Sequence, residues 1–328
     1  MPISSLNITA AEIDQLLTMV REESDHHHDG EDHHHDGEDH TYAAVETPAG
    51  EAKNQLQRTY GKQGFRTLIV TRFEQRGKQL RRIWFKLGAD STLADWSAPN
   101  VAMRLEIPVQ PEEFAGIDGT PETASRAYTV AEVSAETGEI AIDFVTHGST
   151  SPVMRWLERV AVDDTIYTWA PQQHRVPLAG TKTVFIADAT ALPAALSILR
   201  TTPTELVAGL ITSAPADELD HNYDFLEGVE VIMAGADPGQ LANEFTARDW
   251  SGLESVWAAG ETAEMKPLRT HTRKTLGFAK QNTQVYGYWK RGLTTTALDV
   301  NRMRQVRETL ASGGDLSELE RRFEEDGV

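Results

Sequence analysis

Cysteine is absent from all 328 residues of the sequence. This absence excludes disulfide bonds, a thiol nucleophile and any iron–sulfur cluster held by cysteine. An electron-transfer path within the chain would therefore have to use an organic cofactor. A chain without disulfides also suits a reducing compartment, so we expect a cytoplasmic protein.

Long apolar runs and basic patches are absent as well. Hydrophobic residues make up 40% of the chain, but no run approaches the roughly 18 apolar residues that suggest a membrane span. The N-terminal segment has neither the basic nor the apolar stretch of a secretory signal. The sequence also lacks a basic stripe with interleaved aromatic residues, so we expect no nucleic-acid partner. The length favours two domains, and a monomer is the default expectation although the sequence leaves the oligomeric state open.

The formal net charge of −19 is unevenly distributed. Residues 22–40 hold nine acidic side chains and no lysine or arginine, so they supply almost half of that charge. Within this tail the heptapeptide DHHHDGE occurs twice, at 25–31 and at 32–38. Low hydrophobicity and high charge predict that the tail is disordered in the free chain. Ahead of it, Thr9 and Glu12 have the capping-box spacing and predict a short helix that docks on the body or on a partner chain.

The tail is also histidine-rich. Imidazoles interleaved with carboxylates suit borderline divalent metals such as zinc, nickel or ferrous iron. One hypothesis is a loose metal sink or sensor without fixed geometry, and the other is a solvated linker that binds no metal. The candidate ligands are His26, His27, His28, His33, His34, His35 and His40.

Two periodicities divide the remaining chain. Between about residues 64 and 177, short strands separated by turn signals predict a six-stranded antiparallel barrel. The expected strands are 67–72, 82–87, 103–107, 128–133, 140–145 and 165–169, with a turn at 136–139. After Gly180, strands at 182–187, 205–212, 229–234 and 255–259 alternate with helices at 191–200, 240–248 and 263–276. This alternation predicts a doubly wound parallel α/β domain.

One pair of neighbouring strands looks like the wall of a flavin site. Arg126 and Tyr128 share one face of a strand by the period of two. An arginine beside a tyrosine can hold a diphosphate while the ring faces a flat heterocycle, and Thr129 adds a hydroxyl. The next strand carries D-F-V-T-H-G, from Asp143 to Gly148. Taken alone, the first motif could instead be a basic strand end with a packing tyrosine.

The second domain offers a place for a nucleotide. Thr190 lies where a strand gives way to a helix, so we expect it to cap a helix whose N-terminus can seat a phosphate. Gly260 lets the backbone approach a ligand closely at the end of another strand. No G-x-G-x-x-G segment occurs, so the standard dinucleotide fingerprint is missing.

Six motifs in register resemble the siderophore-interacting proteins, flavin-dependent ferric-siderophore reductases related to ferredoxin-NADP reductases. The resemblance covers about residues 60–297. The motifs are Arg126–Thr129, Asp143–Gly148, Ser151–Trp156, Asp188–Ala194, Trp257–Glu261 and Tyr288–Gly292. The chain departs from the family pattern at Ser151 and Ala170, which replace glycines, at Met154, which replaces a serine, and at Ala189, which replaces an acidic residue.

The resemblance implies FAD, with FMN as the alternative, and either NADPH or NADH. A ferric siderophore would be the substrate, and its reduction would release Fe(II) for iron assimilation. The implied cofactor-binding residues are Arg126, Tyr128, Thr129, Asp143, Val145, His147, Gly148, Arg155, Trp156, Asp188, Thr190, Ala191, Gly260, Glu261 and Trp289. The basic positions implied for the substrate are Arg104, Arg155, Lys290 and Arg291.

The expected organisation has four parts. Residues 1–41 form the short helix and the tail, 42–178 the flavin barrel, 179–292 the NAD(P)H-binding domain and 293–328 a helical extension. Two other functions stay open at this point. One is a general flavin or ferric reductase, and the other is a non-enzymatic metal-binding protein with a degenerate flavin site.

Overall fold

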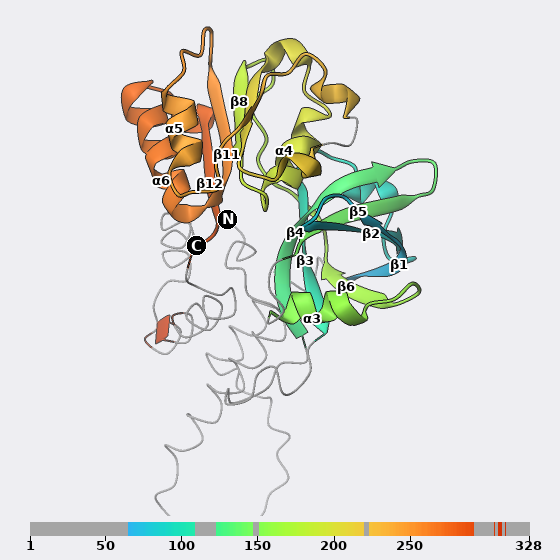
Figure 1. The fold of residues 1–328 in the computed structure, drawn as a ribbon. Helices are drawn as coiled ribbons and strands as arrows, with labels where there is room; N and C mark the ends of the chain where they lie inside the picture. Colours follow the sequence, from blue (N-terminus) through green and yellow to red (C-terminus); the bar gives the residue numbers. More distant parts are fainter. Residues whose placement is uncertain are drawn as a thin grey trace, which may run out of the picture. The chain divides into compact units, whose positions relative to one another are not determined.

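The computed structural model describes residues 65–108, 123–146, 151–219 and 223–291, together with Gln305, Glu308, Thr309 and Ser312. The chain divides into two compact units. One of them, made of Phe65–Glu113 and Glu122–Thr295 with the last two residues, contains every helix and strand discussed below. It holds two β-sheets of different kinds (Figure 1).

The first sheet is an antiparallel barrel. Its strand order is β4-β5-β2-β1-β6-β3-β7, and an additional pairing of β4 with β3 closes it. Six strands therefore form the barrel, which confirms the prediction, and the two-residue strand β7 extends the edge of β3. The bounds are β1 Phe65–Gln75, β2 Leu80–Leu87, β3 Val101–Pro108, β4 Thr123–Ser134, β5 Glu139–Val145, β6 Thr165–Trp169 and β7 Gln172–Gln173.

Alternation along the strands fills the barrel. Ile140, Ile142 and Phe144 occupy every second position of β5 and all lie in the barrel core. The turn between β4 and β5 confirms the predicted turn, and Gly138 adopts a φ of +70° there, a conformation that favours glycine. Irregularities in register within β1 and β4 add the local bending that a closed sheet requires.

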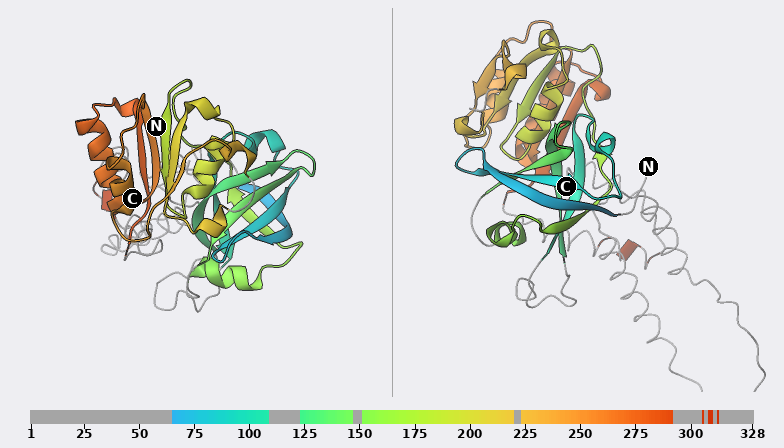
Figure 2. Two further views of the ribbon diagram at one scale, coloured as in Figure 1. Left: turned by 45° about the horizontal axis from the view of Figure 1, so that its top comes forward. Right: turned by 90° about the vertical axis from the view of Figure 1, so that its right-hand side faces the viewer.

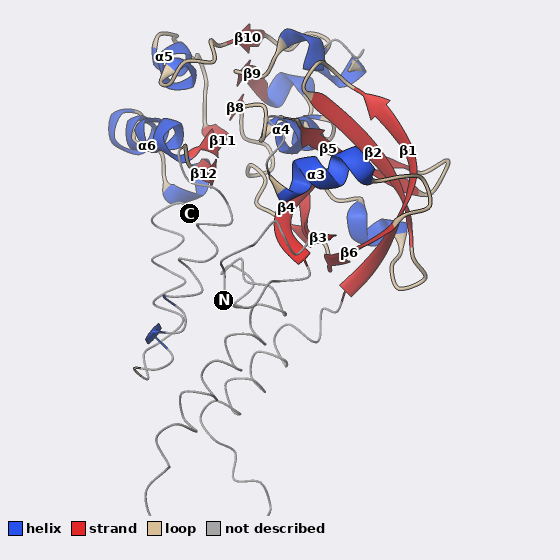
Figure 3. Ribbon diagram, turned by 60° about the horizontal axis from the view of Figure 1, so that its bottom comes forward, coloured by secondary structure: helices blue, strands red, loops and turns tan. Residues whose placement is uncertain are grey.

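Helix α3 (Pro152–Arg159) lies across one end of the barrel (Figure 3). This helix is not among the helices predicted from the sequence. Ser151 is the N-cap, its Oγ accepts the Met154 N–H at 3.2 Å, and Pro152 suits the first turn of a helix. Four side chains of α3 enter the barrel core, namely Val153, Met154, Trp156 and Leu157.

The second sheet has five parallel strands in the order β10-β9-β8-β11-β12. Its strands are β8 Thr183–Ala187, β9 Val207–Thr212, β10 Val231–Met233, β11 Ser255–Glu261 and β12 Thr283–Trp289. Its helices are α4 Leu192–Leu199, α5 Gln240–Thr246 and α6 Thr262–Thr270. Short helical turns lie at Leu93–Trp96, Thr204–Leu206, Ala216–Glu218, Asp224–Leu226, His271–Thr275 and Lys280–Asn282.

Helices cover both faces of this sheet, with α4 on one face and α5 and α6 on the other (Figures 1 and 2). Alternate residues of β11 serve the two cores: Trp257 packs on the α4 side, and Val256 packs on the α5 and α6 side. All five residues of β8 are buried, which explains why that strand reads as a continuous apolar run. The predicted doubly wound sheet is therefore confirmed.

Two elements differ from the sequence prediction. The helix predicted at 263–276 is shorter than expected: α6 ends at Thr270, and the chain continues as a single π-helical turn. Strand β12 is absent from the predicted strands because Thr283, Gln284 and Gly287 interrupt its apolar pattern. Among the helices of the described part of the chain, none has the length and apolar character needed to span a bilayer.

Candidate functional site

The first group of predicted site residues lies on β4. Arg126, Tyr128 and Thr129 are each half-buried. The Arg126 Nη1–H donates to the Ser125 carbonyl at 2.8 Å, which holds the guanidinium against its own strand. Burial raises the pKa of the Tyr128 phenol well above its usual value, and the nearby charge of Arg126 opposes that effect only in part. Tyr128 therefore stays un-ionised at physiological pH.

An aromatic chain joins this strand to its neighbours. The rings of Tyr128 and Phe144 have centroids 4.6 Å apart, and those of Phe144 and Trp156 lie 5.6 Å apart. Both contacts are tilted, as aromatic pairs prefer. The structure thus brings the R-x-Y-T strand, the D-F-V strand and helix α3 together, although Trp156 is buried in the core at 4% exposure.

Arg104, one of the predicted substrate positions, lies beside Arg126. Its Nε–H donates to the Ser125 hydroxyl at 3.1 Å, and its Nη2 donates to the same Ser125 carbonyl that Arg126 uses. The Ser125 hydroxyl in turn donates to Glu106, which also accepts the Trp169 indole N–H at 3.0 Å. Two basic side chains are therefore positioned by one serine, on adjacent strands of the barrel.

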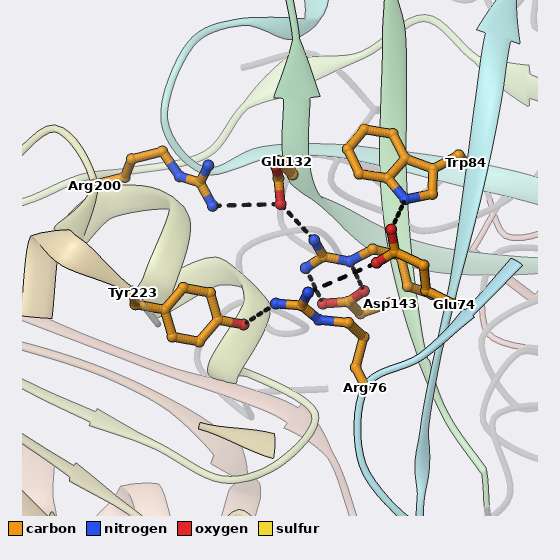
Figure 4. Close-up of polar contacts among 8 residues, drawn as sticks. Glu74, Arg76, Trp84, Glu132, Asp143, Arg200 and Tyr223 are labelled. Atoms are coloured by element: carbon orange, nitrogen blue, oxygen red, sulfur yellow. Dashed lines mark hydrogen bonds and ion pairs between the residues drawn. The ribbon is translucent and has the colours of Figure 1, made fainter. Parts of the chain in front are cut away.

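Asp143 has a different environment from the one that the motif suggests. It lies opposite Arg82 in the β2–β5 pair, and Arg82 Nε and Nη2 donate to its two carboxylate oxygens at 2.7 and 2.9 Å. Arg82 also contacts Glu132, which lies 3.9 Å from Arg200 at the end of α4 (Figure 4). Burial alone would lower the pKa of Arg82, but Asp143 raises it above its usual value. The Asp143 carboxylate is thus committed to a buried ion pair.

The second group gathers around Asp188 at the carboxyl end of β8. Its Oδ1 accepts hydrogen bonds from the Thr190 N–H at 2.9 Å, the Thr190 hydroxyl at 2.6 Å and the Ala191 N–H at 3.0 Å. Its Oδ2 accepts the Glu261 N–H at 3.0 Å and the Trp289 indole N–H at 2.7 Å. Asp188 is only 8% exposed, so these donors offset the cost of burying its charge. Five of the predicted residues meet at this one carboxylate or its immediate neighbours.

The cap of helix α4 differs from the prediction. The expected cap was Thr190, but the N-cap residue is Ala191, and no side chain of its own caps the helix. Asp188 satisfies the N–H groups of Thr190 and Ala191 instead. The prediction is therefore wrong in the residue, because a carboxylate two positions earlier accepts more hydrogen bonds than the threonine hydroxyl can.

Gly260 is required by the same carboxylate. A Cβ at this position would lie 2.7 Å from Asp188 Oδ2 and 2.8 Å from its Cγ, and the backbone has a φ of +154°. The next residue, Glu261, caps α6: its Oε2 accepts the N–H groups of Ala263 and Glu264, and its Oε1 accepts the Arg291 N–H at 2.9 Å. The ends of β11 and β12 are thereby fastened together.

The basic positions after β12 are exposed. Arg291 lies over the Trp289 ring, with its guanidinium carbon 5.6 Å from the ring centroid, and both Lys290 and Arg291 face solvent. Arg155 lies half-buried on α3, and Val145 is half-buried at the end of β5. The structure therefore places Arg104 and Arg155 on barrel elements, and Lys290 and Arg291 on the parallel sheet.

A buried carboxyl that the sequence analysis missed lies where the β1–β2 hairpin meets the segment after β9. Glu218 is fully buried, and neither of its carboxylate oxygens has a hydrogen-bond partner within the described residues. A Cβ on Gly77 would lie 2.9 Å from Glu218 Cγ, so the hairpin packs directly on it. The neighbouring Lys78 N–H donates to Asp217 at 2.8 Å. Arg76 donates to the Tyr223 hydroxyl at 3.0 Å (Figure 4).

Sequence reasoning missed two buried charged residues, Arg82 and Glu218. Arg82 could have been noticed, because it is a charged residue in the apolar strand 80–87 and lies in register with Asp143. Glu218 carries no such signal, since it lies in an irregular segment. His147, Gly148 and the seven histidines of the tail are outside the described residues. Within the part that is described, no three histidine, aspartate or glutamate side chains are grouped to hold a metal ion.

Two family models match the chain, and together they cover both sheets. The siderophore-interacting FAD-binding domain matches residues 69–175, and the siderophore-interacting protein model matches residues 181–292. The chain belongs to the siderophore-interacting protein family. The resemblance drawn from the six sequence motifs is thereby confirmed.

Known siderophore-interacting proteins and related chains agree with this assignment. Ferric acinetobactin reductase of Acinetobacter baumannii is 30% identical over 232 residues, which cover 69% of this chain and 78% of that protein. The mycobactin import protein IrtA of Mycolicibacterium smegmatis is 32% identical over 53% of this chain, but the match spans only 21% of that longer protein. The solved siderophore-interacting protein of A. baumannii superimposes with a TM-score of 0.65 at 26% identity, covering 76% of this chain and 98% of its own.

The contact between Gly260 and Asp188 yields a first prediction. We expect Gly260→Ala to lower the free energy of unfolding by about 1–3 kcal/mol, because the added methyl group collides with a fixed carboxylate. Urea denaturation would measure the change. Gly235→Ala is the matched control, since the nearest atom to its Cβ is a flexible glutamine carbon at 3.4 Å. Equal stabilities of the two variants would contradict the role given to Gly260.

The buried Glu218 yields a prediction about pH. Burial, followed by the charges of Asp217 and Asp143, raises the pKa of Glu218 to about 7, so folding disfavours the ionised form. Stability from the protonated form is complete below the unfolded pKa and falls as pH rises through about 7. Glu218→Gln should therefore raise the free energy of unfolding by about 1–3 kcal/mol at pH 8 and change it little at pH 5.

The control for this measurement is Glu227→Gln, at an exposed position in the same segment. It should change the stability by no more than about 0.5 kcal/mol at either pH. A stability gain in Glu218→Gln that is the same at pH 5 and pH 8 would show that ionisation of Glu218 is not its cause.

Proposed function

We propose that this protein is an NAD(P)H-dependent flavoprotein that reduces ferric siderophores and releases Fe(II). The observation that carries the proposal is that each of the two sheets coincides with a different family segment. The barrel coincides with the FAD-binding family segment, and the parallel sheet coincides with the segment that follows it. The names of relatives such as ferric acinetobactin reductase support the same reaction class.

The residues of β4 and β5 fit a flavin, and FAD suits them better than FMN because the matched domain is a FAD-binding one. Arg126 offers a cation for a diphosphate, Thr129 offers a hydroxyl, and Tyr128 offers a neutral ring on the same strand. Val145, His147, Gly148, Arg155 and Trp156 complete the proposed flavin-binding residues. When bound, the flavin would accept a hydride and deliver single electrons to iron.

Asp143 would support the flavin site by holding the backbone of β5 in place, and its carboxylate would not contact the flavin. The ion pair with Arg82 fixes β5 against β2, so the strand presents its end in one position. In the parallel sheet, Asp188 would likewise hold the backbone at Thr190, Ala191 and Gly260 in one position. The carboxyl ends of parallel strands are where nucleotides bind in open α/β sheets, and these ends are fastened together here.

Four basic residues would receive the substrate. Ferric siderophores are commonly anionic, so a locally basic entry would attract them although the whole chain is acidic. Arg104 and Arg155 would supply this charge from barrel elements, and Lys290 and Arg291 from the end of β12. Fe(III) in the chelate would gain an electron, and the resulting Fe(II) is a softer ion that the chelator holds less tightly.

The domain limits of 42–178 and 179–292 are kept as part of this proposal, since the last barrel pairing ends at Gln173 and β8 begins at Thr183. The histidine-rich tail at 25–40 would be an additional low-affinity site for zinc, nickel or ferrous iron. Its composition supports this role, because imidazole and carboxylate groups alternate there.

The reaction can be tested directly on the purified full-length protein. It should bind FAD, lose the flavin absorbance on addition of a nicotinamide nucleotide under nitrogen, and regain it when a ferric siderophore is added. A ferrous chelator should then report one Fe(II) per electron. Reduction of free flavin without any reoxidation by ferric siderophores would instead identify a general flavin reductase.

A comparison of two variants separates the flavin contact from the ion pair. Arg126→Ala should weaken FAD binding by about 1.5–3 kcal/mol, the cost of a charge-assisted hydrogen bond, with little loss of stability. Asp143→Asn should instead destabilise the fold by about 3 kcal/mol or more, because it leaves Arg82 buried with less compensating charge. Fluorescence titration with FAD and urea denaturation measure the two effects. An Arg126→Ala variant with unchanged FAD affinity would mean that the diphosphate lies elsewhere.

Deletion of residues 24–40 tests the tail. We expect the melting temperature and the flavin content to stay nearly unchanged, because a segment of this composition buries little surface. Zinc or nickel binding, measured by calorimetry, should largely disappear. Equal metal uptake by the full-length protein and the deletion variant would support the linker interpretation.

A further inference from the structure

The strand order of the parallel sheet indicates which strands would meet each half of a dinucleotide. In the order β10-β9-β8-β11-β12, the strands β8, β9 and β10 follow one another outward to one edge of the sheet. The chain then crosses to the other side of β8, where β11 and β12 lie. A dinucleotide lies across this switch point, with its pyrophosphate at the first strand-to-helix turn and its adenosine ribose at the end of the second strand. Here that turn is Asp188–Leu192, and the second strand is β9.

The segments that follow β9 and β10 carry no lysine or arginine of their own. The β1–β2 hairpin places Arg76 and Lys78 against the segment after β9, and the Arg76 guanidinium is held by the Tyr223 hydroxyl at 3.0 Å and by Glu74 at 3.6 Å. Residues 201–247, which include both strands and the loops at both of their ends, contain nine acidic residues and neither lysine nor arginine. The basic residues that flank this stretch are Arg200 and Arg248. Arg200 lies at the C-terminal end of α4, where it approaches Glu132 of the barrel and its guanidinium carbon lies 5.1 Å from the centroid of the Phe225 ring. Arg248 follows the C-terminal end of α5 and pairs with Glu244.

Acceptors rather than donors are found at the carboxyl end of β10. Asp237 is exposed there, and its carboxylate has no hydrogen bond or ion pair among the described residues. On α6, Glu264 is 9% exposed; its Oε1 accepts the Gly239 N–H, and its Oε2 has no hydrogen-bond partner within the described part of the chain. The exposed Asp237 carboxylate can accept hydrogen bonds from ribose hydroxyls, and the two carboxylates together would repel a phosphate.

We propose that the nucleotide site selects NADH over NADPH. The two nucleotides differ in the 2′-phosphate of the adenosine ribose, which adds a charge of about −1.5 to −2 at neutral pH. A protein that accepts it commonly places an arginine beside the end of the second strand, whereas a carboxylate there accepts the free 2′-hydroxyl. The loops after β9 and β10 match the second case, because they contain carboxylates and neither lysine nor arginine. Discrimination would come chiefly from repulsion of the wrong nucleotide.

The cations at the other side of the switch point do not remove this repulsion. Lys290 and Arg291 follow β12, which is separated from β9 by β8 and β11. At about 4.7–4.9 Å between neighbouring strands, β12 and β9 lie about 14 Å apart. That distance exceeds the Debye length of about 8 Å at physiological ionic strength, so these charges are largely screened at the ribose.

The test measures binding as well as flavin reduction, because the inference rests on the proposed function. The FAD-loaded full-length protein is titrated by calorimetry with 5′-AMP and with adenosine 2′,5′-bisphosphate. NADH and NADPH are then compared by stopped flow from the loss of flavin absorbance. We expect 5′-AMP and NADH to be favoured about tenfold or more, a difference of about 1.4 kcal/mol.

A gain of function sharpens the test. Ala236 is exposed in the loop after β10, so Ala236→Arg should strengthen binding of the 2′,5′-bisphosphate several-fold and leave 5′-AMP nearly unchanged. Ala247→Arg is the matched control, since Ala247 is exposed at the C-terminal end of α5, at the opposite edge of the sheet. It should alter neither affinity.

The outcomes separate the two proposals. Tighter or equal binding of the 2′,5′-bisphosphate, or equal use of NADPH, would overturn the inference while leaving the reductase function intact. Flavin that no nicotinamide nucleotide can reduce would overturn the proposed function, and the inference with it. A similar gain from Ala247→Arg would show that added net charge, rather than the edge of β9 and β10, governs the preference.

Discussion

The buried carboxylate of Asp188 is the group on which the carboxyl edge of the parallel sheet depends. It accepts hydrogen bonds from the turn after β8, from Glu261 at the end of β11 and from Trp289 at the end of β12. Three sequence motifs that are up to about a hundred residues apart therefore meet at one side chain. Gly260 follows from the same constraint, because any larger residue would displace the carboxylate.

The barrel contains a comparable constraint in the pair of Arg82 and Asp143. Two parallel N–H···O contacts and the nearby Glu132 compensate a guanidinium that is 2% exposed. Removing one partner of such a pair is costly, because the remaining charge stays buried. Asp143 belongs to a motif that suggests cofactor contact, yet its carboxylate is used by the fold. Under the proposed function, this motif would position the strand, and the side chains of Arg126 and Tyr128 on the neighbouring strand would contact the flavin.

The sequence was sufficient to predict elements with a strong period and insufficient where side chains from distant segments decide the structure. Alternation predicted all six barrel strands, and Thr165–Trp169 has the predicted bounds. Helix α3 was missed because it has only eight residues and lies between two strands of the barrel, in a region where the strand pattern dominates. Thr190 was given a role that Asp188 performs, since the competition among nearby acceptors depends on where β11 and β12 end. Glu218 could not be found, because its burial results from the packing of the β1–β2 hairpin on an irregular segment.

Charge placement, rather than total charge, connects these features to function. A chain with a net charge of −19 would repel an anionic chelate if its charges acted at long range. At physiological ionic strength, however, exposed charges are screened beyond about 8 Å, so only the nearest groups matter. Arg104 and Arg126 converge on one carbonyl of β4, and Arg291 lies over Trp289, whereas the loops after β9 and β10 are acidic. Under the proposed function, the same acidic protein can therefore attract an anionic iron chelate at one place and reject a single extra phosphate at another.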